Sequence, residues 1–131
     1  MPKNVRLTES KASLELQTYL ISQRWWVRKT HGNIYQMGLP DLLVGRKRDG
    51  RLMLLELKII QGQKRYTSMT IFNELSGPQI GVILLLAKIR SPVFIIARCP
   101  EGWLFSKSPF KTEETLYPMS ILELYQLLNE Q

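Results

Sequence analysis

The amino-acid sequence predicts an α/β fold in which helices flank a mixed central sheet. Three observations lead to this prediction. Segments with helical spacing of apolar residues occur between short, strand-like apolar runs. An Asp-Gly dipeptide at residues 49–50, between two apolar runs, indicates a β-hairpin. The length of 131 residues, without an internal repeat or a linker, suits one domain built around one core.

The first expected element is a helix that begins at Glu9, after a basic tail. Thr8 can cap this helix, and Glu9 lies where a negative charge interacts favourably with the helix dipole. About four turns are predicted from the apolar side chains at three- and four-residue spacing, which are Ala12, Leu16 and Leu20. Glu9 extends this inward stripe by one turn, whereas Glu15 lies nearer the helix flank.

The first strand is expected at residues 25–29, which read WWVRK. Alternation along a strand sends Trp25 and Val27 to one side and Trp26 and Arg28 to the other. Tryptophan side chains at such positions are more often buried than exposed as stacking platforms for bases, so both are expected in the core.

A hairpin from residue 38 to residue 58 is the element around which the chain is organised. With a two-residue turn at 49–50, Asp41 faces Lys58, and Glu56 lies two residues earlier on the same strand. The three ionisable side chains then share one face. Both faces of the two strands are otherwise apolar, so we expect the pair to be covered on both sides.

The charged residues of this hairpin allow two interpretations. Buried charges are costly unless they are paired or bind a metal. Lys58 could form a buried ion pair with Asp41 or Glu56. Alternatively, both carboxylates could ligate one ion such as Mg²⁺, because diagonal neighbours on adjacent strands are close enough. The residues alone leave both interpretations open.

Residues 59–75 show no regular period and are predicted to form a long loop, which is usually functional or mobile. Lys64, Arg65 and Tyr66 form a basic-aromatic cluster of the kind that neutralises phosphates and stacks on an unpaired base. The alternative is a solvated flexible loop. The position of the cluster directly after Lys58 favours contact with nucleic acid.

A second helix is predicted to begin after Ser76, with proline in its first turn and Gln79 at capping-box spacing. The apolar run at 80–89 indicates that this helix is buried. Short strands are expected at 93–97 and 103–105, and Cys99 is expected to be semi-buried.

An amphipathic helix is expected at about residues 120–130, begun by a capping box of Ser120 and Glu123. Its apolar stripe either packs on the sheet or meets its copy in a second subunit. The core of the domain is therefore expected at about residues 9–105, followed by this C-terminal helix.

Composition limits the classes of partner. A net charge of +7 and a pI near 9.8 attract polyanions, of which nucleic acid is the commonest. No apolar run approaches the roughly 20 residues of a membrane-spanning helix, and residues 1–8 form no leader. A single cysteine excludes an intramolecular disulfide and a zinc cluster. We expect a cytoplasmic protein without membrane association, and a viral or cellular origin is left open.

Pro40-Asp41, a hairpin and then Glu56-Leu57-Lys58 resemble the signature of the PD-(D/E)xK nuclease superfamily. With Gly38-Leu39 before the first motif and Glu9-Ser10-Lys11 before the first helix, the string is similar to the virus-type replication-repair nuclease (VRR-NUC) branch. It resembles the archaeal-type Holliday-junction resolvases more distantly. The resemblance covers about residues 9–105 and implies a restriction-endonuclease-like αβββαβ core.

The resemblance also implies roles for individual residues. The implied catalytic residues are Glu9, Asp41, Glu56, Lys58 and Gln79. The implied ligands of Mg²⁺, with Mn²⁺ as a substitute, are Asp41, Glu56, the main-chain carbonyl of Leu57, and Glu9. Three alternatives stay open: Glu9 as a charge that only compensates the helix dipole, Glu15 as the helical carboxylate of the site, and Gln79 as a helix cap. DNA contacts are expected from Arg28, Lys29, Thr30, His31, Lys64, Arg65 and Tyr66, with His31 otherwise an idle loop residue.

The implied activity is metal-dependent hydrolysis of phosphodiesters that leaves a 5′-phosphate. A small basic chain without a sequence-reading module favours structure-selective cutting of branched DNA, foremost four-way junctions, by a homodimer whose two sites match two symmetric strands. A general DNA-processing nuclease, a catalytically silent DNA-binding protein of the same fold and a metal-independent ribonuclease are the alternatives.

Overall fold

A computed structural model describes residues 6–30, 38–107 and 114–131 of the chain. The helices and strands, in chain order, are α1 (Glu9–Ser22), β1 (Trp26–Lys29), β2 (Leu42–Gly45), β3 (Leu52–Ile59), β4 (Tyr66–Thr67), α2 (Ser68–Phe72), α3 (Gly77–Lys88), β5 (Val93–Cys99), β6 (Gly102–Ser106), β7 (Thr115–Leu116) and α4 (Ile121–Asn129). The predicted helices and main strands are all present, and β4, α2 and β7 were not predicted.

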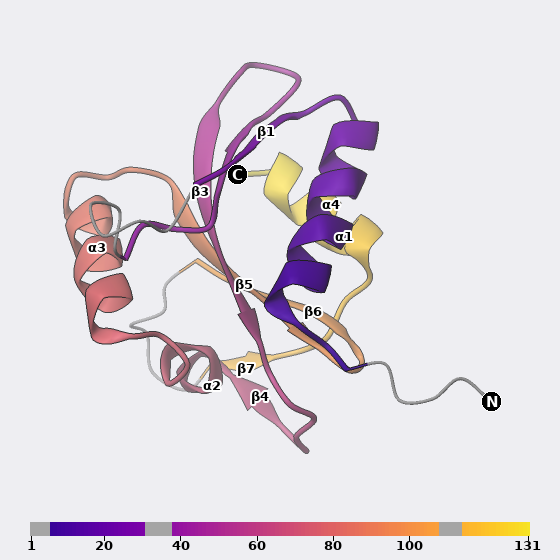
Figure 1. The fold of residues 1–131 in the computed structure, drawn as a ribbon, viewed down its shortest axis with the longest axis vertical. Coiled ribbons are helices and arrows are strands. Elements are labelled where there is room, and N and C mark those ends of the chain that lie inside the picture. Colours follow the sequence, from indigo (N-terminus) through magenta and orange to yellow (C-terminus); the bar gives the residue numbers. More distant parts are fainter. Residues whose placement is uncertain (1–5, 31–37, 108–113) are drawn as a thin grey trace.

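A five-stranded sheet in the order β1-β2-β3-β5-β6 forms the centre of the fold. β3 and β5 are parallel, and the other neighbours are antiparallel, so the sheet is mixed as predicted. α1 and α4 lie together on one side of this sheet and α3 lies on the other, as Figure 1 shows. β4 and β7 pair separately as a two-stranded sheet.

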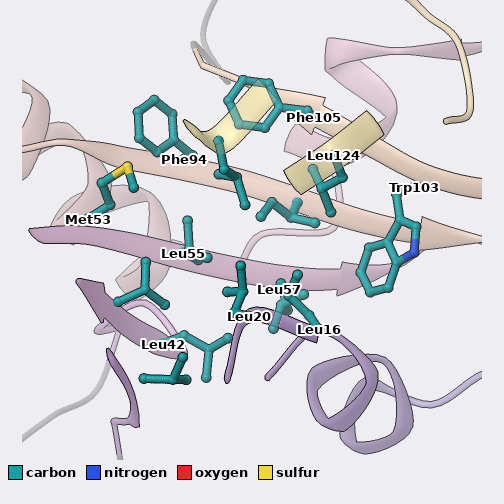
Figure 2. Packing of buried hydrophobic residues seen from close by; sticks show 14 of the residues in the cluster. Leu16, Leu20, Leu42, Met53, Leu55, Leu57, Phe94, Trp103, Phe105 and Leu124 are labelled. Carbon is teal, nitrogen blue, oxygen red and sulfur yellow. The ribbon is translucent and has the colours of Figure 1, made fainter. Parts of the chain in front are cut away.

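Alternation along the central strands divides the core into two apolar layers. In β3, Leu55 and Leu57 pack in the layer under α1 and α4, where Figure 2 shows them near Leu16 and Leu20. In β5, Ile95 belongs to the opposite layer, under α2 and α3. Strands covered on both faces explain the continuous apolar runs in the sequence.

The register of the hairpin differs from the predicted one by two residues. Leu43 pairs with Leu54, whereas the predicted register would pair it with Glu56, so Asp41 does not lie opposite Lys58. The connection is longer than a two-residue turn, because the main chains of Arg46 and Arg51 still pair by a hydrogen bond of 2.9 Å. Within it, the Asp49 carboxylate accepts hydrogen bonds from the Arg46 guanidinium at 2.7 and 3.0 Å. A slip of two residues keeps each side chain on its predicted face, because side chains alternate with a period of two.

One tryptophan of β1 is not in the core as expected. Trp25 and Val27 are buried under α1 and α4, but Trp26 is 45% exposed on the opposite face. The alternation was predicted correctly. The burial was predicted wrongly because β1 is an edge strand. Among the described residues, no side chain of β1 belongs to the apolar layer on the face where Trp26 lies.

The helix α3 also differs from its prediction. Its capping box of Ser76 and Gln79 is present, and Pro78 lies in the first turn, as expected. Of its residues, however, only Ile83 is buried, and Leu84 and Leu85 are exposed. The helix covers the sheet with one side, while its apolar residues continue around the whole circumference.

The predicted loop at 59–75 contains the end of β3, the strand β4 and the helix α2, which a capping box of Thr67 and Thr70 begins. Cys99 is fully buried rather than semi-buried, because it lies in the layer between β5 and α2.

The apolar stripe of α4 packs on the sheet, which decides between the two alternatives left open for it. Leu124 and Leu128 are fully buried, and the Tyr125 ring contacts those of Tyr19 and Trp25, each at 5.7 Å between centroids. Within the described ranges, no helix has the length and apolar character needed to cross a membrane.

Candidate active site

Two carboxyl groups come together where β2 begins beside β3. Because Leu42 pairs with Leu55, the residue before β2, Asp41, lies next to Glu56 on the neighbouring strand. One oxygen of the Asp41 carboxylate accepts a hydrogen bond of 2.8 Å from the main-chain N–H of Leu57. The cross-strand neighbours that the sequence placed on one face therefore do meet.

The end of β1 holds the Pro40-Asp41 segment in position. The Thr30 hydroxyl donates a hydrogen bond of 2.5 Å to the carbonyl of Pro40, and the Thr30 N–H donates one of 2.9 Å to the carbonyl of Asp41. Thr30, predicted to touch DNA, thus has a structural role in presenting Asp41.

Gln79 combines the two roles that the sequence left as alternatives. Its side-chain carbonyl accepts a hydrogen bond of 2.8 Å from the Ser76 N–H, which completes the capping box of α3. Its side-chain amide donates a hydrogen bond of 3.3 Å to the Glu56 carboxylate. The start of α3 is therefore attached to the carboxyl pair through one side chain.

Gly38 allows the Pro40-Asp41 segment to approach this helix start. Its φ of 87° lies in the left-handed region, and a Cβ atom there would lie 2.5 Å from the carbonyl oxygen of Pro78. Glycine meets both requirements, because it has no Cβ and adopts positive φ readily.

The electrostatics of the site favour a proton or a cation between the carboxyl groups. Burial, followed by hydrogen bonding to Asp41 and repulsion from its charge, raises the pKa of Glu56 to about 9, although Lys58 acts in the opposite direction. Desolvation also raises the pKa of Glu9, with Lys58 again opposing and with Asp41 and Glu74 adding to the increase. Glu9, Asp41, Glu56 and Lys58 therefore share one electrostatic environment.

A second, independent observation indicates that the carboxyl pair could bind a cation. The Glu56 side chain is fully buried, yet no donor in the described part of the chain gives a hydrogen bond to its oxygen Oε1, and a bond to the Asp41 carboxylate requires a proton between the two groups. A buried carboxylate oxygen without a donor is costly, and a metal ion would satisfy it. No three side chains of His, Cys, Asp or Glu gather around one metal position within residues 6–30, 38–107 and 114–131. Mg²⁺ needs just one or two carboxylates, because it retains several waters.

The alternative of a buried ion pair is not what the structure shows. Ion pairs between described residues join Arg46 to Asp49 and Arg98 to Glu15, and Lys58 takes part in neither. Lys58 is half-buried near the carboxyl pair and lowers the pKa of Glu56 from a longer range.

The two candidate glutamates of α1 lie in different surroundings. Glu15 is 46% exposed and pairs with Arg98 at 3.3 Å. Glu9 instead lines a hollow of about 130 Å³ together with Lys29, Thr30, Asp41 and Leu57. Glu9 is thus the α1 carboxylate that faces the carboxyl pair.

Sequence reasoning missed Glu74, whose charge adds to the raised pKa of Glu9. No sequence signal could have found it, because it follows the unpredicted helix α2 within a segment that was expected to be a loop.

The residues expected to touch DNA lie in different surroundings. Arg28 is exposed, and its guanidinium lies over the Trp26 ring, 4.8 Å from the centroid. Lys64 and Arg65 are exposed, with the Arg65 guanidinium donating a hydrogen bond of 2.9 Å to the Thr115 hydroxyl. His31 lies outside the described residues.

The prediction that Tyr66 stacks on a base is wrong. The side chain is 5% exposed, and its hydroxyl donates a hydrogen bond of 2.5 Å to the Glu101 carboxylate. Burial and this bond raise the pKa of Tyr66 to about 12. A ring packed in the layer under α2 and α3 has no free face for a base.

Comparisons with known proteins bear on the fold. No family model matches the sequence, and no curated protein sequence matches it. The structure is similar to that of Archaeoglobus fulgidus Hjc, a Holliday junction resolvase from an archaeal hyperthermophile, with a TM-score of 0.55 and 13% sequence identity. The match covers 88% of this chain and 92% of that chain. The predicted α/β fold, with a mixed central sheet flanked by helices, is thereby confirmed, while the likeness to the VRR-NUC branch stays a prediction.

Proposed function

We propose that the chain is a Mg²⁺-dependent endonuclease that hydrolyses phosphodiesters in branched DNA and acts foremost on four-way junctions. The observation that carries this proposal is the buried Glu56 carboxyl group, which lies beside Asp41 and has one oxygen that receives no hydrogen bond from a donor among the described residues. The fold shared with a Holliday junction resolvase supports it, as does the net charge of +7.

The metal would be held by Asp41, Glu56 and the main-chain carbonyl of Leu57, with Glu9 bridging to a second position beside them. A bound Mg²⁺, or Mn²⁺ in its place, supplies Lewis acidity and positive charge at the scissile phosphate. The Leu57 N–H fixes the orientation of Asp41, and the Gln79 amide fixes that of Glu56.

Lys58 acts on the substrate in this proposal. Its ammonium group is close enough to influence both Glu9 and Glu56 without forming an ion pair with either. It is therefore available to orient the attacking water or to stabilise negative charge on the phosphate in the transition state. The expected product carries a 5′-phosphate.

A cleavage assay tests the proposal. A labelled four-way junction, a fork, a flap and a linear duplex are incubated at one salt concentration with Mg²⁺ or with EDTA, because basic proteins bind all DNA at low salt. We expect cleavage of the junction that EDTA abolishes. Equal cleavage of the linear duplex would indicate a general DNA-processing nuclease. Cleavage of RNA in EDTA would indicate a metal-independent ribonuclease, and no product on any substrate would indicate a silent DNA-binding protein.

We also propose a homodimer in which α3 contacts its copy. A helix that is apolar all round is normally buried, yet Leu85 and Ile89 are 59% and 63% exposed. Two copies related by a two-fold axis would cover these residues and present two sites to the symmetric strands of a junction.

Substituting charged residues on α3 should separate the two subunits. We expect sedimentation equilibrium to give a dimer for the wild type and a monomer for the variant with Leu85→Lys and Ile89→Lys. Leu14→Lys, at an exposed apolar position of α1, is the matched control and should stay dimeric. A wild type that is monomeric at every concentration, or a doubly substituted protein that remains a dimer, would contradict this interface.

The proposed location is the cytoplasm. The single cysteine, Cys99, is buried as a free thiol, which suits a reducing compartment.

A further inference from the structure

A second hollow, of about 550 Å³, lies on the sheet away from the carboxyl pair. Trp26 and Leu52 form two of its walls and are 45% and 55% exposed, although both are large apolar side chains. Gly45 lies between them, paired with both across the sheet. A Cβ atom at Gly45 would be 3.4 Å from that of Trp26 and 3.6 Å from the Leu52 side chain, so a side chain there would occupy space between the two walls of the hollow.

The surroundings of the hollow are cationic. Arg24 and Lys47 line it and are exposed, and the guanidinium of Arg28 lies over the Trp26 ring. The nearby acidic residue of the hairpin loop, Asp49, is paired with the buried Arg46, which neutralises it. An exposed aromatic ring among exposed cations complements a ligand that is both planar and anionic.

The hollow and the Glu56 side chain lie on the same face of the sheet. Trp26 pairs with Gly45 and Gly45 with Leu52, and side chains of directly paired residues share a face. Leu52 and Glu56 are four residues apart on β3 and so also share that face. At about 3.3 Å per residue, the two positions are roughly 13 Å apart, which is about four base steps of DNA.

We propose that this hollow binds an unpaired nucleotide of the DNA substrate, with its base on the Trp26 ring and its phosphates near Arg24, Arg28 and Lys47. The inference rests on the proposed nuclease function and extends it to the form of the substrate. A continuous duplex keeps its bases stacked and paired, whereas a branch point offers bases that can stack on a protein ring. Trp26 would thus favour DNA with unpaired bases near the cleaved bond.

Fluorescence can test this inference without cleavage. Trp25 and Trp103 are 4% and 2% exposed, so Trp26 is the tryptophan of the chain that a ligand can reach. In EDTA, titration with oligothymidylate should quench the fluorescence of Trp26, and a blunt duplex of equal phosphate count should not. Quenching that is equal for both ligands, or absent for both, would overturn the stacking of a base.

Affinity measurements on variants complete the test. Trp26→Ala should weaken binding of oligothymidylate between about 5-fold and about 150-fold, the range expected for one stacked base, and leave duplex binding unchanged. Trp26→Phe should restore part of the loss. Tyr117→Ala, at an aromatic position that is 76% exposed outside the hollow, is the matched control and should bind as the wild type does. Equal binding of oligothymidylate by Trp26→Ala and the wild type would refute the inference.

The two proposals can fail separately. Junction cleavage in Mg²⁺ by a protein whose Trp26→Ala variant binds oligothymidylate normally would remove the nucleotide site and keep the nuclease. Selective binding of oligothymidylate by a protein that cleaves nothing would keep the nucleotide site and remove the nuclease.

Discussion

Glu56→Ala is expected to reduce Mg²⁺-dependent cleavage of a four-way junction by at least about a thousandfold. This corresponds to about 4 kcal/mol of lost transition-state stabilisation. Asp41→Ala should have an effect of the same order, because the two carboxyl groups are the ones proposed to hold one metal. Binding of the junction in EDTA should not weaken, since neither carboxylate attracts DNA.

Isosteric and distant substitutions serve as controls for this prediction. Glu56→Gln and Asp41→Asn remove the charge with little change of shape and should be nearly as inactive as the alanine variants. Glu9→Gln should lose less activity, because Glu9 lines the hollow beside Asp41 but, within the described residues, does not gather with Asp41 and Glu56 around one metal position. Glu15→Gln, on the same helix but paired with Arg98, should cleave as the wild type does. Retained cleavage by Glu56→Ala or Asp41→Ala would exclude the proposed metal site.

The metal-free protein is expected to become less stable as the pH rises from about 4.5 to about 9. The pKa of a glutamate carboxyl group is ordinarily 4.5, as in an unfolded chain, and that of Glu56 in the folded protein is about 9. Between these two pH values the folded chain therefore holds a proton that the unfolded chain has released. The free energy of unfolding therefore falls with pH, by at most about 1.4 kcal/mol per pH unit from this group. The stabilisation from the protonated Glu56 carboxyl group is fully present below pH 4.5 and is lost as the pH rises through about 9, the pKa of this group in the folded protein.

Thermal unfolding in EDTA across this range, compared between the wild type and Glu56→Gln, measures the effect. The variant cannot ionise at position 56, so its unfolding temperature should change less with pH and should exceed that of the wild type at pH 9. Added Mg²⁺ should raise the unfolding temperature of the wild type most at high pH, where the cation no longer competes with the proton. Parallel curves for the two proteins in EDTA would mean that Glu56 is ionised throughout.

The parts of the fold that were predicted correctly depend on short-range signals. Thr8, Ser76 and Ser120 each begin a helix where the sequence indicated, because a cap requires contact only with residues about three positions away. The grouping of Asp41 with Glu56 was also predicted, although the hairpin register was wrong. The slip was of two residues, and a slip of one would have placed the carboxylates on opposite faces.

The errors concern contacts between residues that are distant in the sequence. The burial of Tyr66 depends on Glu101, which follows it by 35 residues. The exposure of Trp26 depends on the place of β1 at the edge of the sheet, which no local pattern specifies. The choice between Glu9 and Glu15 as the carboxylate of the site depends on Arg98, a residue of β5 that forms an ion pair with Glu15. Local pattern thus predicted the elements, while their mutual placement decided which side chains are accessible.

The double role of Gln79 limits which residues natural variation or a mutant library can accept at this position. Glutamate would keep the oxygen that caps the helix but would place a third acidic group against Glu56. Leucine would lose both hydrogen bonds. Folding and chemistry are therefore selected together at position 79, and a library at this position should yield few variants that are improved in one property without a change in the other.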